Sequence, residues 1–344
     1  MRKTLLITTL LYCSHSLVAQ DFTAIYNADS SLTGFKNAQS GVVLAPQFVQ
    51  VGGNKFQDVV AVMTEEKAGN WHGYYLFRSM KKAGTDSLYM FDNAFDCENE
   101  GFIRFTDHKT DKTGVLNREG KVVVPAKYNY VSMVTNGVLV ALQGAKKEPD
   151  GEHYFYSGGK VSLIDTSNQV LVEEFKEVPH LNMYSLQITD QPATDTTRVS
   201  YKGVNGLYYT IQVFNKEFSQ WLRRDLLPGL TKEKMITHSF PEISYWDEAK
   251  GWVFEDREKF VEKHWDYIQA MFRQVEDFTF MTEGLNPYIF EGPRYNQYIN
   301  NCFQAKEWRY PLISVFIGNS NEKGSLDFLR TDEGYRLIGL GFEK

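Results

Sequence analysis

Residues 113–128 read TGVLNREGKVVVPAKY. A short apolar run ends at Asn117, Gly120 follows in a turn position, a β-prone run leads to Pro125, and an aromatic ring closes the stretch at Tyr128. Asn and Gly tolerate the positive φ angles of tight turns, whereas Pro cannot donate to a strand ladder. The stretch therefore predicts a β-hairpin whose pairing stops near Pro125. We expect Pro125 and Tyr128 to be structural rather than functional.

The same pattern occurs twice more in the first half of the chain. Residues 33–48 read TGFKNAQSGVVLAPQF and repeat it closely. Residues 163–175 read LIDTSNQVLVEEF and repeat it more weakly, with Asn168 in the turn position and Glu173 in place of the proline. The first half is thus predicted to be a degenerate array of hairpins.

These segments resemble WG repeats, whose consensus is a Trp-Gly-x-Ile-Asp strand, a turn, a Gly-x-Val-Val-x-Pro strand and an aromatic residue. Asn136-Gly137 matches the step into the next strand of the repeat, and Trp71-His72-Gly73 matches its namesake dipeptide with one residue inserted. Departures from the consensus are Thr33, Thr113 and Val161 in place of Trp, and Ser162 in place of Gly. The resemblance covers residues 30–180 and implies stacked hairpins, while the number of stacked repeats stays open.

Further strands are expected up to residue 213. The runs at 198–201 and 207–211 are rich in β-branched and aromatic residues and flank Asn205-Gly206, which is a strong hairpin signal. We therefore predict one β-rich, WG-repeat-like region over residues 21–213.

The second part of the chain, residues 214–344, is predicted to be an α+β domain. Apolar residues at helical spacing indicate helices over 214–226, 231–236 and 256–273. Strands follow at 312–317 and in a hairpin that joins 325–330 to 335–342. Helices packed on a curved antiparallel sheet are the fold class that this order favours.

Residues 328–337, FLRTDEGYRL, resemble the closing hairpin of NTF2-like domains if Glu333 is an insertion. The resemblance implies a cone-shaped pocket in which an Asp or His can move a proton on a ligand. Its candidates by position are His238, Tyr245, Asp247 and Asp327. General acid or base chemistry needs a tuned pKa and contact with the substrate, which a sequence does not reveal. A surface or structural role is therefore favoured for each of them.

Export is predicted from residues 1–20. Arg2 and Lys3 precede the apolar run 4–13, and Ala19 offers a small residue before a cleavage point, which is the layout of a signal peptide. Ten apolar residues are too few for a bilayer-spanning helix, so we expect no transmembrane segment after cleavage. The predicted location is the periplasm or the extracellular space. The mature chain keeps 35 basic and 43 acidic residues, a net charge of −8 that argues against nucleic-acid binding.

Two cysteines remain after signal removal, Cys97 and Cys302, which lie 205 residues apart. In an oxidising compartment they could form one disulfide, but two separate buried thiols are the favoured interpretation.

Sequence motifs for catalysis are absent. The chain has no Gly-x-Ser-x-Gly, His-Glu-x-x-His, Walker or dinucleotide glycine motif, so we assign no catalytic, cofactor-binding or metal-binding residue. His264, on a helix lined with Phe and Trp, is expected to be a core histidine. An aromatic group could line a ligand cleft or a partner surface, although core packing is favoured; its members are Tyr288, Phe290, Tyr295, Tyr298 and Phe303.

The function predicted from these observations is an exported binding or interaction module of a bacterial envelope, with an unknown protein or small-molecule ligand. One alternative is a small-molecule enzyme that uses a pocket in the C-terminal domain. The other is a purely structural envelope component. A non-enzyme is favoured, and no cofactor is expected.

Overall fold

The computed structural model describes residues 21–67, 69–176, 178–273, 278–317 and 324–342. The predicted signal peptide lies outside the described residues. The chain is rich in strands, with small antiparallel sheets in its first part and one larger sheet with helices in its second part. This arrangement agrees broadly with the predicted α+β class.

In the described residues between 22 and 213, the strands form five small sheets and two separate hairpins. The first sheet, ordered β3-β2-β1-β5, contains β1 Phe22–Tyr26, β2 Thr33–Lys36, β3 Val43–Phe48 and β5 Lys55–Phe56. The second, β4-β6-β7-β8, contains β4 Gln50–Val51, β6 Val59–Lys67, β7 Asn70–Phe77 and β8 Lys82–Ala83. The third, β11-β12-β13, contains β11 Phe102–Asp107, β12 Lys112–Asn117 and β13 Val122–Tyr128. The fourth, β14-β15-β18-β19, contains β14 Tyr130–Val131, β15 Val138–Gln143, β18 Lys160–Asp165 and β19 Val170–Val172. The fifth, β20-β22-β21, contains β20 Leu181–Thr189, β21 Arg198–Lys202 and β22 Tyr208–Val213. The separate hairpins are β9 Met90–Phe91 with β10 Ala94–Phe95, and β16 Lys146–Asp150 with β17 His153–Ser157.

The three sequence repeats form the same turn. The side-chain oxygen of Asn117 accepts hydrogen bonds from the backbone N–H groups of Glu119 and Lys121, at 3.2 and 2.9 Å. Asn37 and Asp165 accept equivalent bonds in their own hairpins. Backbone φ is positive at the corresponding turn residues, which are Gly41, Gly120 and Asn168. The predicted hairpins are therefore confirmed, and their turns follow from the residue types noted above.

Gly114 is required by the close approach of the neighbouring strand. A Cβ atom there would lie 2.6 Å from the carbonyl oxygen of Val124 and 2.6 Å from the Phe105 ring. Pro125 does not end the strand, contrary to the prediction, because β13 continues to Tyr128. Instead the β12–β13 register shifts between the pairs Thr113–Tyr128 and Val115–Val124, so the proline lies in a bulge where no ladder donor is needed.

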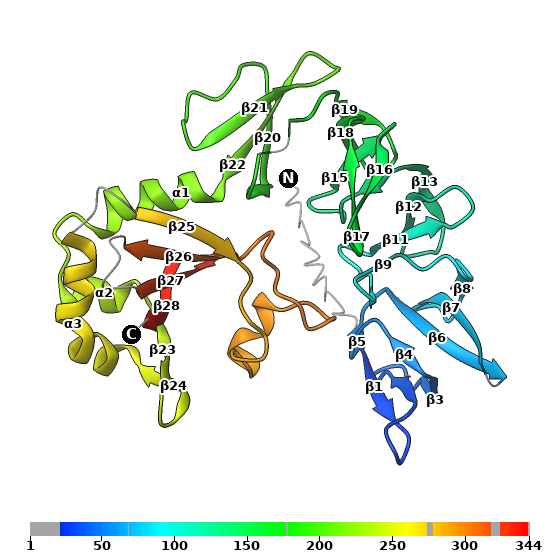
Figure 1. Ribbon diagram of the computed structural model, residues 1–344, viewed down its shortest axis with the longest axis horizontal. Helices are drawn as coiled ribbons and strands as arrows, with labels where there is room; N and C mark the ends of the chain where they lie inside the picture. The colour runs from blue at the N-terminus through cyan, green and yellow to red at the C-terminus, as the bar shows by residue number, and fades with distance from the viewer. Residues whose placement is uncertain (1–20, 68, 177, 274–277, 318–323, 343–344) are drawn as a thin grey trace, which may run out of the picture.

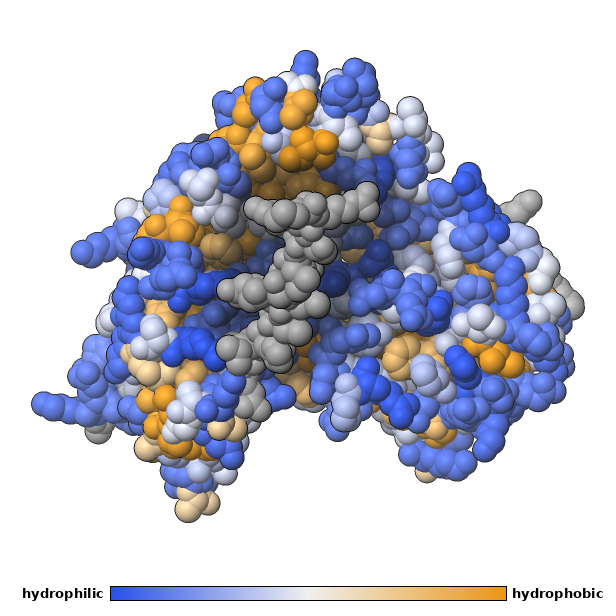
Figure 2. Space-filling view, turned by 180° about the vertical axis from the view of Figure 1, so that it is seen from behind, coloured by the Kyte–Doolittle hydropathy of each residue, from blue (hydrophilic) through white to orange (hydrophobic). Residues whose placement is uncertain are grey.

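The small sheets follow one another along an arc, from β1 at the lower right to the β20–β22 sheet at the top (Figure 1). Each sheet buries apolar side chains against the next one, so the repeat region has a succession of small cores rather than one large core. On the opposite face, hydrophobic residues gather at the top of the molecule, where the β20–β22 sheet lies (Figure 2). Exposed apolar residues of this part of the chain are Ile188, Val204 and Leu207.

The second part of the chain contains a six-stranded sheet, ordered β24-β23-β28-β27-β26-β25, with helices packed against it. Its helices are α1 Phe214–Trp221, continued by a π-helical turn Leu222–Leu226, then α2 Lys232–Thr237, α3 Arg257–Arg273 and a 3₁₀ turn Pro293–Tyr298. Its strands are β23 Ser239–Asp247, β24 Gly251–Asp256, β25 Phe278–Glu283, β26 Leu312–Ile317, β27 Gly324–Thr331 and β28 Gly334–Phe342. The predicted helices and the final hairpin are present. The sheet is not wholly antiparallel, because β23 and β28 pair in parallel, and the prediction also missed β23, β24 and β25.

Residues 284–311 connect the two parts of the molecule. This segment leaves β25 and reaches back toward the start of the repeat arc (Figure 1). It carries Cys302, which forms a disulfide with Cys97, with the two Cα atoms 6.0 Å apart. The favoured expectation of two separate thiols was therefore wrong: residues 205 positions apart become neighbours because the arc curves toward the C-terminal sheet.

Candidate functional site

A cavity of about 450 Å³ opens where the β6–β8 sheet, the β11–β13 sheet and the β16–β17 hairpin come together. We call it the tyrosine cleft. Its aromatic and methionine lining consists of Trp71, Tyr89, Tyr130, Tyr154, Tyr156, Met63 and Met90. A volume of this size lies within the range of ligand-binding pockets.

Local backbone features place the rings. Tyr154 and Tyr156 lie two residues apart on β17, so they share one face of the hairpin, and their ring centroids are 5.5 Å apart. On the facing wall, Gly73 makes room for Leu88, since a Cβ atom there would lie 2.5 Å from Leu88 Cδ1. Trp71, on the same strand as Gly73, is 53% exposed and Tyr154 is 52% exposed. Large ring faces are therefore open to solvent at the mouth of the cleft.

Each carboxylate of the tyrosine cleft has a basic side chain beside it. Lys147 Nζ lies 2.9 Å from Asp111 Oδ2 and 3.9 Å above the centroid of the Tyr154 ring. Asp86 Oδ2 lies 3.2 Å from His72 Nδ1. Lys147 therefore offsets the charge of Asp111, and His72 gives Asp86 a hydrogen-bond partner that is a cation only when protonated.

Two phenol groups of the cleft, those of Tyr156 and Tyr89, have pKa values above the ordinary range of tyrosine. Burial raises the pKa of Tyr156, and the neighbouring Tyr154 and Asp111 raise it further. Burial also raises the pKa of Tyr89, although the Arg104 guanidinium opposes this shift. A neutral phenol both donates and accepts a hydrogen bond, so these tyrosines suit a ligand that carries hydroxyl groups.

A second cavity of about 370 Å³ lies on the other side of Tyr89 and Tyr130, which line both cavities. We call it the strap cavity, because its lining includes Gln304 from the segment 284–311. Phe91, on β9, also lines it and is 74% exposed. Ser132 and Met133 also line it.

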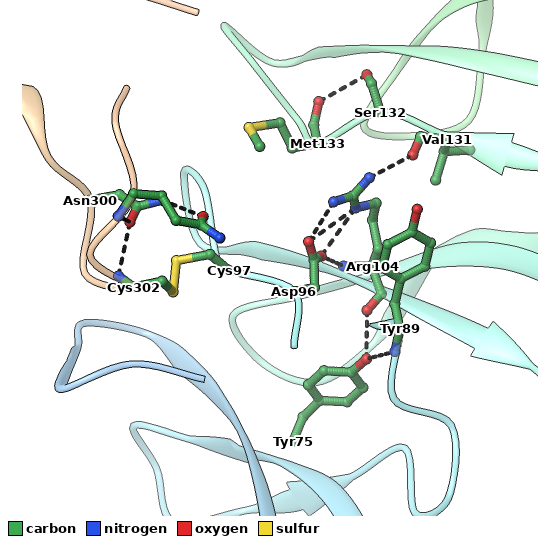
Figure 3. Close-up of polar contacts among 11 residues, drawn as sticks. Tyr75, Tyr89, Asp96, Cys97, Arg104, Val131, Ser132, Met133, Asn300 and Cys302 are labelled. Carbon is green, nitrogen blue, oxygen red and sulfur yellow. Dashed lines mark hydrogen bonds and ion pairs between the residues drawn. A yellow bond between two sulfur atoms is a disulfide. The ribbon is translucent and has the colours of Figure 1, made fainter. Parts of the chain in front are cut away.

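A buried ion pair supports the wall that the two cavities share (Figure 3). Arg104 Nη2 donates to Asp96 Oδ1 at 2.6 Å, and its guanidinium carbon lies 4.2 Å from the centroid of the Tyr89 ring. Tyr75 Oη accepts from the Tyr89 backbone N–H at 2.8 Å and donates to the Arg104 carbonyl oxygen at 2.6 Å. Asp96 precedes Cys97, so the disulfide adjoins this network (Figure 3). Tyr89 is therefore held rigidly between the two cavities.

The four residues that the sequence singled out in the second part of the chain, His238, Tyr245, Asp247 and Asp327, do not form one site. Asp247 Oδ1 accepts from the backbone N–H groups of Ala249 and Lys250, so it serves the β23–β24 turn. Tyr245 Oη accepts from Lys263 Nζ at 3.0 Å, and the ring lies in the helix-covered core.

His238 and Asp327 lie on opposite faces of the sheet. The His238 ring packs against Trp221 on the helix side, and burial lowers its pKa. Leu326 and Phe328 also face the helices, so Asp327 between them points to the other face, where burial raises the pKa of its carboxyl. The structure does not bring these two groups together.

The remaining sequence candidates are mostly core residues. Phe290, Tyr295 and Tyr298 are buried in a cluster with Leu285 and other apolar side chains, as core packing requires. Tyr288 and Phe303 are exposed instead, and their centroids lie 5.0 Å apart. The His264 ring packs 4.6 Å from Phe260, and burial lowers its pKa, as expected for a core histidine. Within the described parts of the chain, no group of three or more His, Cys, Asp or Glu residues could hold a metal ion.

Sequence reasoning missed the tyrosine cleft. One signal was available, because residues 146–157 insert an aromatic-rich hairpin around Asp150-Gly151 between two strands of the fourth sheet. Trp71 belongs to the Trp-His-Gly repeat motif, and its ring is exposed at the cleft.

Comparison with known families agrees with the central repeat. Residues 114–146 match the family model of the WG containing repeat, which spans β12 to the start of β16. No curated protein matches the chain. Among the residues that the structure describes, no helix combines the length and the apolar character that crossing a membrane requires.

Proposed function

We propose that this protein is an exported binding module that holds its ligand in the tyrosine cleft. The observation that carries the proposal is the cleft itself, in which exposed rings of Trp71 and Tyr154 surround a cavity of about 450 Å³ with paired charges. Exposed aromatic rings over a preformed cavity are characteristic of recognition sites, because they supply contact area at a low entropic cost.

Export is supported by two independent features. The signal-like residues 1–20 predict delivery to the periplasm or the extracellular space. A disulfide between Cys97 and Cys302 suits an oxidising compartment. The place of action that we propose is therefore the bacterial envelope or its surroundings.

The C-terminal domain supports a weaker alternative, namely a small-molecule enzyme with an NTF2-like cone. The observation in its favour is Asp327, whose buried carboxyl has a raised pKa, the property of a general acid or base. Asp327 and His238 lie on opposite faces of the sheet, so these two candidates cannot act on one substrate atom together. We therefore favour binding over catalysis, and a structural role for the sheet.

Thermal-shift measurements test the binding proposal. The probes are neutral, acidic and basic oligosaccharides together with short aromatic, acidic and basic peptides. A ligand at a hundred times its Kd stabilises the folded state by about 2.7 kcal/mol, which is readily seen as a rise in Tm. We expect at least one probe to raise the Tm of the parent protein but not that of Trp71→Ala or Tyr154→Ala.

Trp246→Ala is the matched control, because Trp246 is 51% exposed on β23, far from the cleft in sequence, and Trp71 is 53% exposed. This control should respond to the probe as the parent does. The proposal is contradicted if no probe gives a Trp71-dependent shift, or if Trp246→Ala loses the response as well.

A further inference from the structure

We propose that the tyrosine cleft and the strap cavity together bind one neutral oligosaccharide chain, with sugar units on both sides of Tyr89 and Tyr130. This inference rests on the proposed function and adds the chemical class and the length of the ligand. It follows from the geometry of the two cavities, the distribution of charge, and the exposure of the rings.

Adjacency of the two cavities favours an elongated ligand that crosses their shared wall, where Tyr130 is 37% exposed. Tyr89 and Tyr130 line both of them, so the cavities adjoin along one surface. Trp71 and Tyr154 stand at one side of this pair, and Phe91 stands at the other. A ligand no larger than one cavity would leave the exposed Phe91 ring unused, whereas a chain of several units would contact all the rings.

Paired charges favour a neutral ligand. Every carboxylate that lines the two cavities has a basic side chain close by: His72 at 3.2 Å from Asp86, Lys147 at 2.9 Å from Asp111 and Arg104 at 2.6 Å from Asp96. The Arg104–Asp96 pair is buried, so a charged ligand that took either member would leave the other unpaired at a cost in free energy. The Lys147–Asp111 pair is exposed and costs less to break. An uncharged chain leaves all three pairs intact.

The polar groups suit hydroxyls. Phenol oxygens of Tyr89, Tyr130, Tyr154 and Tyr156 can each donate and accept a hydrogen bond, as can the hydroxyl groups of a sugar. The flat ring faces of Trp71 and Phe91 offer surfaces on which the C–H face of a pyranose ring can pack. Saccharide units meet both requirements at once.

Tyr89, in the wall that the two cavities share, is held in place before a ligand binds. The Tyr89 backbone and ring are fixed by Tyr75 and Arg104, and the second cavity is completed by Gln304, two residues after Cys302. A ligand therefore pays little reorganisation cost at the centre of the site.

Isothermal titration calorimetry with the full chain tests the inference. The probes are the neutral hexasaccharides cellohexaose, maltohexaose and hexa-N-acetylchitohexaose, each compared with its own disaccharide. For the sugar that binds, we expect the hexasaccharide to bind at least about tenfold more tightly than the disaccharide. Phe91→Ala should weaken the binding of the hexasaccharide by about fivefold or more and leave the affinity for the disaccharide unchanged, because only the longer chain reaches this ring.

Tyr288→Ala is the control for Phe91→Ala, since Tyr288 is 77% exposed and Phe91 74%. Trp71→Ala should weaken both lengths. The extended site is refuted if the hexasaccharide and the disaccharide bind with equal affinity, or if Phe91→Ala leaves the hexasaccharide affinity unchanged.

The outcomes separate the inference from the binding proposal. If a peptide or a charged sugar binds in a Trp71-dependent way and no neutral sugar does, the tyrosine cleft is a binding site and the saccharide inference is wrong. If no probe depends on Trp71, both proposals fail.

Discussion

Tyr128 is predicted to hold two successive repeats together. Its ring is 4% exposed and packs in the core between the third and fourth sheets, and its hydroxyl donates to Asn168 Oδ1 at 2.8 Å. Truncation of a buried aromatic residue costs roughly 3 to 5 kcal/mol, so Tyr128→Ala should lower the free energy of unfolding by about that amount. Tyr128→Phe keeps the ring and should cost only about 1 kcal/mol, the net value of one hydrogen bond.

A double-mutant cycle isolates the hydrogen bond. Asn168 has a φ of 64°, so Asn168→Gly keeps the turn and removes the acceptor. Tyr128→Phe and Asn168→Gly should therefore be less than additive, with a coupling energy of about 1 kcal/mol in urea unfolding. If Tyr128→Ala unfolds like the parent but loses a ligand, the ring belongs to a binding surface and the structural role is refuted.

Three further predictions concern the whole chain. The double variant Cys97→Ala with Cys302→Ala should lose up to roughly 5 kcal/mol of stability, because the disulfide closes a loop of about 205 residues in the unfolded chain. A reducing agent should lower the Tm of the parent protein but not that of this variant. Mass spectrometry of protein recovered from the envelope or medium should find an N-terminus near Gln20 or Asp21, and an intact Met1 in a cytosolic fraction would contradict export. Residues 214–344 expressed alone should unfold cooperatively in a thermal melt, because the six-stranded sheet and its helices share a core of their own, and a fragment that stays unfolded would show that this core needs the repeat region.

The repeat region was the most predictable part of the fold. The hairpin turns could be predicted from residue type at Asn117, Gly120 and Asn168, because a turn depends on the local backbone conformation that these residues favour. The helices of the second part were equally visible from their apolar spacing. Pro125 was misjudged because a proline can also lie within a bulge, and only the register of both strands distinguishes a bulge from a strand end.

The candidate site was much less predictable, because it depends on contacts between distant segments. Trp71, Tyr89 and Tyr154 lie in three different segments, and no local pattern places them in one cavity. The parallel pairing of β23 with β28 and the disulfide were missed for the same reason. The meeting of the two cysteines depends on the curvature of the whole arc, which small twists accumulated over several sheets determine, whereas the β23–β28 pairing depends on contacts between distant strands of the six-stranded sheet.

In the proposed site, the repeats and the segments added to them have different roles. Regular hairpins supply the scaffold, whereas the β16–β17 hairpin and the segment 284–311 bring Tyr154 and Gln304 to the two cavities. Binding residues commonly lie on such additions, because a rigid scaffold tolerates them and holds them in place. The disulfide joins the second addition to Cys97, which lines the strap cavity but not the tyrosine cleft. Reduction of the disulfide should therefore weaken the binding of a long chain that reaches the strap cavity. The binding of a short ligand in the tyrosine cleft should stay unchanged. If a calorimetric titration finds both affinities equally reduced, the disulfide supports the whole arc instead.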